Sequence, residues 1–248
     1  MPRLSNADSL LVQRKGGKVV GGIKYMKIIN AGYQILSEIS EGGIKELQLI
    51  ERIGRICYKS EGMITPDGES AKKFVKKLIA SGHEAMLEHS SLSVLFTVDR
   101  GVTHELVRHR IMSFAQESTR YCNYSGDKFG NEITVILPCF FDTGMGTASN
   151  SMVYDEWKRS CECAERAYFK LLEHGAQPQQ ARSVLPTSTK ADIVLTGNYR
   201  EWRHFFKLRA CGVTGAPHPQ MLEVTVPLLT EVSNRIPVVF DDLVCDCK

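Results

Sequence analysis

Two kinds of hydrophobic periodicity alternate along the chain, and this alternation restricts the fold more than any other feature of the sequence. Apolar residues recur at helical spacing in three stretches, at residues 44–57, 70–79 and 152–174. Residues 92–98 and 133–137 are rich in β-branched and apolar side chains and predict strands. The helices and strands follow no regular βαβ rhythm, and no G-x-G-x-x-G motif opens a helix. We therefore predict an α+β fold with a mixed or antiparallel sheet flanked by helices.

Length and composition fit one domain. A chain of 248 residues lies within the size that a single hydrophobic core can serve. Residues 1–25 carry two Gly-Gly pairs and little periodicity, so we expect a flexible N-terminal arm before a single compact domain at residues 26–248. A formal net charge of +3 is too small to indicate a nucleic-acid surface. No apolar run reaches the ~20 residues of a membrane helix, so we expect a cytoplasmic protein without a membrane partner.

The eight cysteines are expected to be reduced thiols, because no secretory signal segment opens the sequence. Two C-x-C pairs, Cys161/Cys163 and Cys245/Cys247, lack the matching C-x-x-C partners of a structural zinc site. The cysteine pattern therefore does not favour a metal site.

The densest run of polar side chains is R-H-R-I-M-S at residues 108–113. Successive side chains on a helix diverge by ~100°, so Arg108, His109 and Arg110 cannot all face one ligand. Because arginine forks match phosphate oxygens, the run is predicted to be a wall between two anionic ligands. The alternative is an arginine-rich helix end that makes surface salt bridges.

The polar run continues at residues 116–121. Two hydroxyl groups, on Ser118 and Thr119, stand beside the guanidinium of Arg120, and Tyr121 offers a ring for stacking, which is typical of an anion site. Ser118 could also be a nucleophile. A serine nucleophile needs a positioned base, however, and no nucleophile-elbow motif is present, so phosphate binding is the favoured interpretation.

Residues 198–209 predict a helix on which Trp202, Phe205, Phe206 and Arg209 share one stripe. A second stripe is basic and consists of Arg200, Arg203 and Lys207. The guanidinium of Arg209 cannot lose its charge on the apolar stripe, so it requires either a structural carboxylate or an anionic ligand.

The stretch H-E-A-M-L-E-H at residues 83–89 superficially suggests a zinc protease. That motif needs two histidines four residues apart on one helix face, whereas His83 and His89 are six apart. We therefore predict a capping or ligand-contact turn and no metal site.

Taken together, these blocks resemble the flavin-dependent thymidylate synthases. The signature of that family is R-H-R-x-x-S followed five residues later by S-x-R-Y, and it occurs here at residues 108–113 and 118–121. Three further family blocks stand in family order. They are H-E-x-x-x-E-H at residues 83–89, A-R-x-V-L-P at 181–186 and N-x-R-E-W-R-H-F-F-x-L-R at 198–209. The resemblance covers roughly residues 26–232.

The resemblance implies a reaction with three ligands. Deoxyuridylate (dUMP) would become thymidylate (dTMP), 5,10-methylenetetrahydrofolate would donate the carbon, and FAD reduced by NADPH would supply the hydride. It also implies a homotetramer whose active sites are built from several subunits. The expected partners are therefore small molecules and further copies of the chain, with no nucleic acid.

The resemblance also implies roles for individual residues. The residues implied to contact the flavin are Arg108, His109, Arg110, Gln116, Asn198, Arg200 and His204. Those implied to contact the nucleotide are Glu105, Arg108, Gln116, Glu117, Ser118, Thr119, Arg120, Arg182 and Arg209. Arg209 would stabilise the ionised uracil ring, and His83 and Glu84 would belong to the turn that lines the flavin and folate side. The candidate catalytic residues are Arg209, His83 and Ser118. Ala85, Tyr199 and a longer stretch at 212–219 depart from the family pattern.

Two other functions fit parts of the pattern. A metal-dependent phosphohydrolase could use His83, Glu84, His89 and His109, and it would carry tightly bound metal in place of a flavin spectrum. A non-enzymatic nucleotide- or RNA-binding module could use the same arginines, and it would show steep salt dependence without NADPH oxidation.

Overall fold

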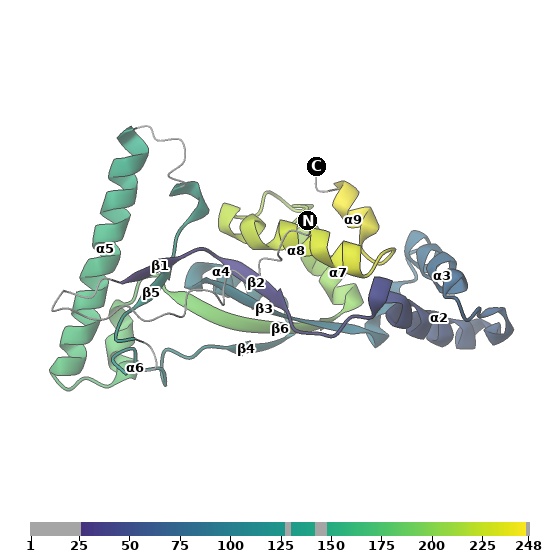
Figure 1. Ribbon diagram of the computed structural model, residues 1–248, viewed down its shortest axis with the longest axis horizontal. Helices are drawn as coiled ribbons and strands as arrows, with labels where there is room; N and C mark the ends of the chain where they lie inside the picture. Colours follow the sequence, from purple (N-terminus) through teal and green to yellow (C-terminus); the bar gives the residue numbers. More distant parts are fainter. Residues whose placement is uncertain (1–25, 127–129, 142–147, 247–248) are drawn as a thin grey trace. The chain divides into compact units, whose positions relative to one another are not determined.

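The computed structural model describes residues 26–126, 130–141 and 148–246 (Figure 1). The predicted arm at residues 1–25 lies outside the described residues. The strands are β1 Lys27–Ile29, β2 Gly32–Ile35, β3 Ser91–Asp99, β4 Ser113–Gln116, β5 Thr134–Ile136 and β6 Lys190–Asn198. The α-helices are α2 Ile44–Tyr58, α3 Glu69–Ala80, α4 Arg100–Leu106, α5 Ala148–Glu173, α6 Pro178–Ala181, α7 Tyr199–Arg209, α8 Pro219–Arg235 and α9 Asp241–Asp246. The 3-10 turns are η1 Glu41–Gly43, η2 Glu61–Met63, η3 Glu84–His89, η5 Cys139–Phe141 and η7 Arg182–Val184.

Contacts group the chain into two units. Of the described residues, the first unit comprises 26–34, 97–101 and those within 116–192, and the second comprises 35–96, 102–115 and 193–246. The chain passes between the units several times, so no single boundary in the sequence separates them.

Four strands form one sheet in the order β2-β3-β6-β4, and β1 and β5 form a separate parallel pair. In β6, every second residue is buried, from Ala191 through Ile193 and Leu195 to Gly197, which is the period of a strand. An antiparallel bridge joins Val135 to Thr189, so both pairing senses occur. The predicted α+β fold is confirmed, with an antiparallel sheet flanked by helices.

The first unit is built around α5. Its apolar side buries Cys161 and Tyr168 against Ile133 and Val135, and these residues belong to one core. Glu165 on the same helix accepts a hydrogen bond from the backbone N–H of Ile133 at 2.9 Å. Figure 1 shows the long helix beside the β1–β5 pair. The predicted helix at 152–174 is thus confirmed, and it begins four residues earlier, at Ala148.

In the second unit, α2 and α3 pack closely together (Figure 1). A Cβ atom at Gly54 would lie 2.5 Å from Cε1 of Phe74, so the close approach of the helices requires glycine at this position. Arg55 lies over the Phe74 ring at 4.7 Å and pairs with Glu51 inside α2. The predicted helices at 44–57 and 70–79 are confirmed to within one residue at each end.

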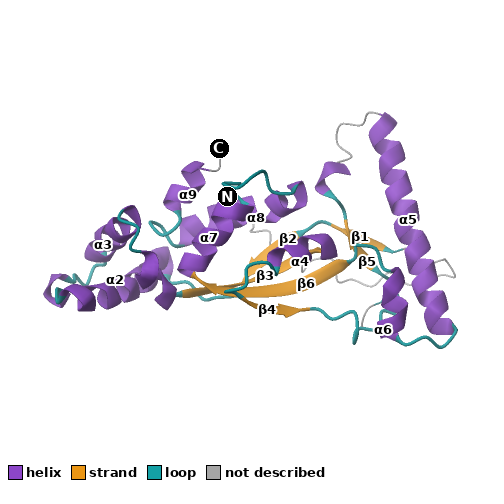
Figure 2. Ribbon diagram, turned by 180° about the vertical axis from the view of Figure 1, so that it is seen from behind, coloured by secondary structure: helices purple, strands orange, loops and turns teal. Residues whose placement is uncertain are grey.

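Helix α7 lies across the sheet within the second unit (Figure 2). The indole N–H of Trp202 donates to the carbonyl of Leu92 in β3 at 2.9 Å, and Phe96 stacks on the Trp202 ring with centroids 6.5 Å apart. Phe205 and Phe206 are fully buried beside them. Burying a large apolar side chain stabilises a fold by roughly 1.5–3 kcal/mol, so this stripe holds α7 in place.

The cysteine prediction is wrong at one position, because Cys211 is in a disulfide bond. The free thiols among the described residues are Cys57, Cys122, Cys139, Cys161 and Cys163. Cys247 lies outside the described residues. The described helices include none that is long and apolar enough to cross a membrane.

Candidate active site

Three of the sequence blocks meet in the second unit: the turn after α4, η3 and the helix α7. Helix α7 starts directly after β6, and the side chain of Asn198 caps it by accepting the backbone N–H of Glu201 at 2.8 Å. Asparagine is among the best N-cap residues because its side chain satisfies an otherwise unpaired helix N–H. The cap fixes where α7 begins, and therefore which side chains it presents.

Arg209, at the end of α7, forms the centre of a polar cluster. Its Nε donates to Nε2 of His109 at 3.1 Å, and its Nη1 donates to Glu105 Oε2 at 2.9 Å. Its Nη2 donates to the backbone carbonyl of Glu105 at 3.3 Å. Both partners come from or just after α4, about a hundred residues earlier in the chain. The structure thus provides the structural carboxylate that was one of the two predicted partners of Arg209.

His109 is buried and neutral in this cluster. Because Nε2 accepts from Arg209, the ring carries its proton on Nδ1, which lies 3.5 Å from Glu201 Oε1. Burial, together with the charges of Arg209 and His204, lowers the pKa of His109 from 6.5 to about 4. Burial also raises the pKa of Glu201, against a smaller opposite effect of His204. The His109 ring therefore stays uncharged at neutral pH.

Among the described residues, one group of possible metal ligands has its atoms within 4.8 Å of one another, namely His109, Glu201 and His204. A metal ion on Nδ1 of His109 would force the proton onto Nε2, where it would point at the N–H of Arg209. A metal ion on Nε2 would have to displace Arg209. The hydrogen bond with Arg209 therefore argues against a metal ion on His109. Of the four residues proposed for a phosphohydrolase, this group contains His109 but not His83, Glu84 or His89.

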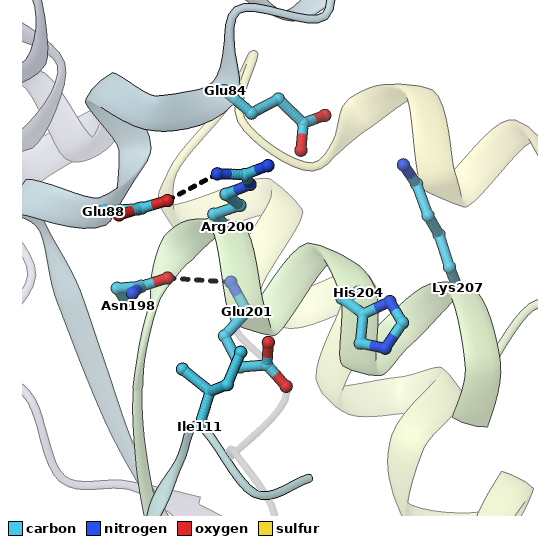
Figure 3. Close-up of a pocket in the computed structure, with 8 residues that line it drawn as sticks. All are labelled: Glu84, Glu88, Ile111, Asn198, Arg200, Glu201, His204 and Lys207. Atoms are coloured by element: carbon cyan, nitrogen blue, oxygen red, sulfur yellow. Dashed lines mark hydrogen bonds and ion pairs between the residues drawn. The ribbon is translucent and has the colours of Figure 1, made fainter.

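A cavity of about 600 Å³ opens beside α7. Figure 3 shows that Asn198, Arg200, His204 and Lys207 line it from α7 and its cap, with Glu84 and Glu88 entering from η3. Arg200 pairs with Glu88 at 2.6 Å. The remaining lining residues are Ile111 and Glu201. Ile111 is 76% exposed, so the cavity combines cations and carboxylates with an unburied apolar surface.

Arg209 itself lines a second cavity, of about 500 Å³. The other lining residues are Glu105, Leu208 and residues 214–218. The N–H of Val213 donates to the carbonyl of Lys207 at 3.0 Å, which ties this loop to the last turn of α7. The loop that departs from the family pattern therefore faces Arg209.

The R-H-R run does not lie in a helix, which corrects the geometry assumed from the sequence. Helix α4 ends at Leu106, and residues 107–112 form turns that lead into β4. The predicted divergence of the three side chains still holds, because His109 is 5% exposed whereas Arg108 and Arg110 are exposed. A turn can separate neighbouring side chains as completely as a helix does.

The H-E-A-M-L-E-H block forms the 3-10 turn η3, as a turn was predicted there, although the His83 side chain does not cap it. Nδ1 of His83 lies 3.5 Å from the hydroxyl of Tyr58. His83 lines a cavity of about 880 Å³ formed by α2, α3 and their connection, whereas Glu84 and Glu88 line the cavity beside α7. Residues of this block therefore line two different cavities.

The remaining predicted nucleotide contacts belong to the first unit. They are Gln116, Glu117, Ser118, Thr119, Arg120 and Arg182. Arg120 donates from its backbone N–H to Oγ of Ser118 at 3.2 Å and from its side chain to Gln179, three residues before Arg182. Within the described residues, no side-chain base is hydrogen-bonded to Ser118. Thr119 is buried, whereas Arg120 and Arg182 are exposed and suited to an anion.

Glu117 is held in a network inside the first unit. It accepts hydrogen bonds from Lys190 Nζ at 2.8 Å and from the Tyr124 hydroxyl at 3.2 Å. Lys190 also pairs with Asp192. Burial lowers the pKa of Lys190, but the hydrogen bonds and charges of Asp192 and Glu117 outweigh it and raise the pKa overall. The carboxylate of Glu117 is thus oriented by protein groups before any ligand binds.

Sequence reasoning missed several residues of this site. Glu88, Ile111, Glu201 and Lys207 line the cavity beside α7 but were not predicted as site residues. Glu88 and Glu201 stand at specified positions of their motif blocks, so those positions were a usable signal. Ile111 and Lys207 stand at variable positions of their blocks, to which the motif assigns no side chain.

Comparison with known proteins identifies the family. Residues 44–238 match the family described as "Thymidylate synthase complementing protein". A flavin-dependent thymidylate synthase of Corynebacterium aurimucosum is 34% identical over 215 residues, which cover 83% of each chain. The chain belongs to this family. A second member, from Mycobacterium avium, is 32% identical over 203 residues, or 78% of each chain.

The fold of the family is also seen in solved structures. A UMP/dUMP methylase from Streptomyces cacaoi, bound with 5-Br UMP, superimposes with a TM-score of 0.72 and 20% identity, covering 90% of this chain and 98% of the other. At that identity the likeness establishes the fold. The chain is therefore an enzyme of the flavin-dependent thymidylate synthase family with the corresponding α+β fold.

Proposed function

We propose that the chain converts dUMP to dTMP, with 5,10-methylenetetrahydrofolate as carbon donor and NADPH-reduced FAD as hydride donor. The observation that carries this proposal is the cluster around Arg209, in which two separate family blocks join through hydrogen bonds between side chains about a hundred residues apart. Named flavin-dependent thymidylate synthases at 31–34% identity support the reaction class.

The cavity beside α7 fits a flavin. Its volume of about 600 Å³ lies in the range of ~300–1,000 Å³ that is usual for ligand sites. Arg200, His204 and Lys207 offer positive or hydrogen-bonding groups for phosphate and ring oxygens, and Ile111 offers an apolar face for a ring. These residues, with Asn198 and His109, would hold FAD. Bound FAD would supply the hydride that completes the methyl group.

The cavity at Arg209 would hold the pyrimidine ring of the nucleotide. Arg209 carries a permanent charge and is 21% exposed, so it can reach a pyrimidine ring and stabilise negative charge on it. In the first unit, Arg120, Arg182 and Ser118 are suited to bind a phosphate group. The solved UMP/dUMP methylase with bound 5-Br dUMP is consistent with a pyrimidine nucleotide as the substrate.

His83 would act on the folate side, because it lines the cavity between α2 and α3 together with Tyr58. We propose that the sites are completed in a homotetramer. The exposed apolar side chains of Ile111 and Tyr121, both more than 75% exposed within the family's signature region, suit contact with another chain.

Flavin binding and reduction test the proposal. Apo protein titrated with FAD should take it up and turn yellow, and bound FAD should be reduced by NADPH and reoxidised when dUMP and methylenetetrahydrofolate are added together. Protein that takes up no FAD contradicts the proposal. So does protein that holds stoichiometric metal in place of flavin, or that binds nucleotide without oxidising NADPH.

A further inference from the structure

Arg203, which the sequence placed on a basic stripe of α7, is fully buried. Its residue exposure is 1%, whereas Arg200 on the same predicted stripe is exposed. Nη1 and Nη2 donate to the two carboxylate oxygens of Asp242 at 2.7 and 2.6 Å, and Nη1 also donates to the carbonyl of Val239. Removing a guanidinium from water is costly unless every donor finds a partner. Asp242 in α9 and Val239 before it accept from three of the five N–H groups of the guanidinium.

The Nε–H group of Arg203 contacts a residue that lines the cavity beside α7. Nε of Arg203 donates to Oε1 of Glu84 at 3.1 Å. Glu84 lines the cavity beside α7, and Figure 3 shows its carboxylate extending over Arg200 toward the interior of the cavity. Arg203 and Asp242 do not line that cavity. One buried cation thus connects the C-terminal helix α9 to a carboxylate on the cavity wall.

Arg203 is held more firmly by Asp242 than by Glu84. Asp242 receives two parallel hydrogen bonds, which fix the plane of the guanidinium. Glu84 then receives a single bond in a fixed direction, which leaves its other oxygen to accept from a hydroxyl or ring N–H of a ligand. Asp241, the neighbour of Asp242, has a different task, since it accepts from the Ser233 hydroxyl at 2.7 Å and from the N–H of Val238 at 2.8 Å.

We propose that Arg203 and Asp242 are positioning residues that orient the carboxylate of Glu84 for the ligand bound beside α7. The C-terminal helix then contributes to ligand binding without touching the ligand. This inference rests on the proposed function, because it takes the ligand to be FAD.

The test is a mutant cycle read by FAD affinity in the otherwise unchanged full chain. Glu84→Gln should weaken FAD binding about tenfold, and Asp242→Asn should weaken it by about threefold to tenfold. The double variant should bind no more weakly than Glu84→Gln alone, because Asp242 acts only through Glu84. Asp241→Asn is the matched control, since it disturbs the same helix but not Arg203, and its FAD affinity should equal that of the wild type.

Thermal melting of each variant separates folding from positioning. Both aspartate variants should melt somewhat earlier, yet only Asp242→Asn should bind FAD more weakly. Unchanged affinity in Asp242→Asn, equal weakening in Asp241→Asn, or additive effects in the double variant would each overturn the inference. Wild-type protein that binds no FAD would overturn the proposed function as well, so the two failures are distinguishable.

Discussion

The neutral, buried His109 predicts that the free energy of unfolding depends on pH between 4 and 6.5. Its pKa is about 4 in the folded chain, and an unfolded histidine titrates near 6.5. As the pH falls below 6.5, the unfolded chain binds the proton first. Stability is therefore complete above pH 6.5 and is lost as the pH falls toward 4. The full shift corresponds to about 3 kcal/mol, and the part lost between pH 7 and pH 5 is about 2 kcal/mol.

Denaturant unfolding of the apo protein at pH 7 and pH 5, followed by tryptophan fluorescence, measures this loss. Trp202 is buried on the same helix as Arg209 and reports on the second unit. His109→Gln removes the titrating ring and keeps every other residue, so the contribution of the rest of the chain is common to the two proteins. The wild type should lose about 2 kcal/mol more than the variant. Equal losses in the two proteins would refute the neutral, buried histidine.

Three further predictions concern the ligand sites. Arg209→Ala should reduce turnover efficiency toward dUMP by about tenfold to several hundredfold. The loss of stability should be small, because the ion pair of Arg209 with Glu105 is partly exposed. Normal turnover in a destabilised protein would contradict a role of Arg209 in catalysis. Ser118→Ala should weaken dUMP binding in a titration yet keep measurable dTMP formation, and complete loss of turnover at unchanged affinity would restore the nucleophile. Lys190→Met should destabilise the first unit by about 1–3 kcal/mol, because it leaves the Glu117 carboxylate without its cation. An unchanged denaturation midpoint would contradict this contribution of the ion pair.

Local pattern predicted the long elements of the fold. The helices α2, α3, α5 and α7 and the strand β3 follow from periodicity and flanking residues, because each is long enough to show its period. The strand β6 was missed although its alternation is complete, and α8 was missed because Pro227 interrupts its pattern. The short strand β4 follows the R-H-R block, where charge obscured any strand signal.

The sequence predicted some members of the site but not the contacts between them. The family resemblance identified Arg209, His109 and Glu105, yet no local pattern shows that Arg209 pairs with residues about a hundred positions away. The burial of Arg203 depends on Asp242, a residue outside every block. Such long-range pairs arise from the packing of α7 against the sheet and α9, which sequence periodicity does not encode.

Product analysis tests the central claim most directly. Purified chain incubated without oxygen with dUMP, methylenetetrahydrofolate, FAD and NADPH should yield dTMP by mass spectrometry, as dUMP increased by one CH₂ group. Omitting any one of the four should abolish the product. Oxidation of NADPH without dTMP in the complete mixture, or no reaction at all with FAD bound, would contradict the assignment of this chain as a thymidylate-forming enzyme.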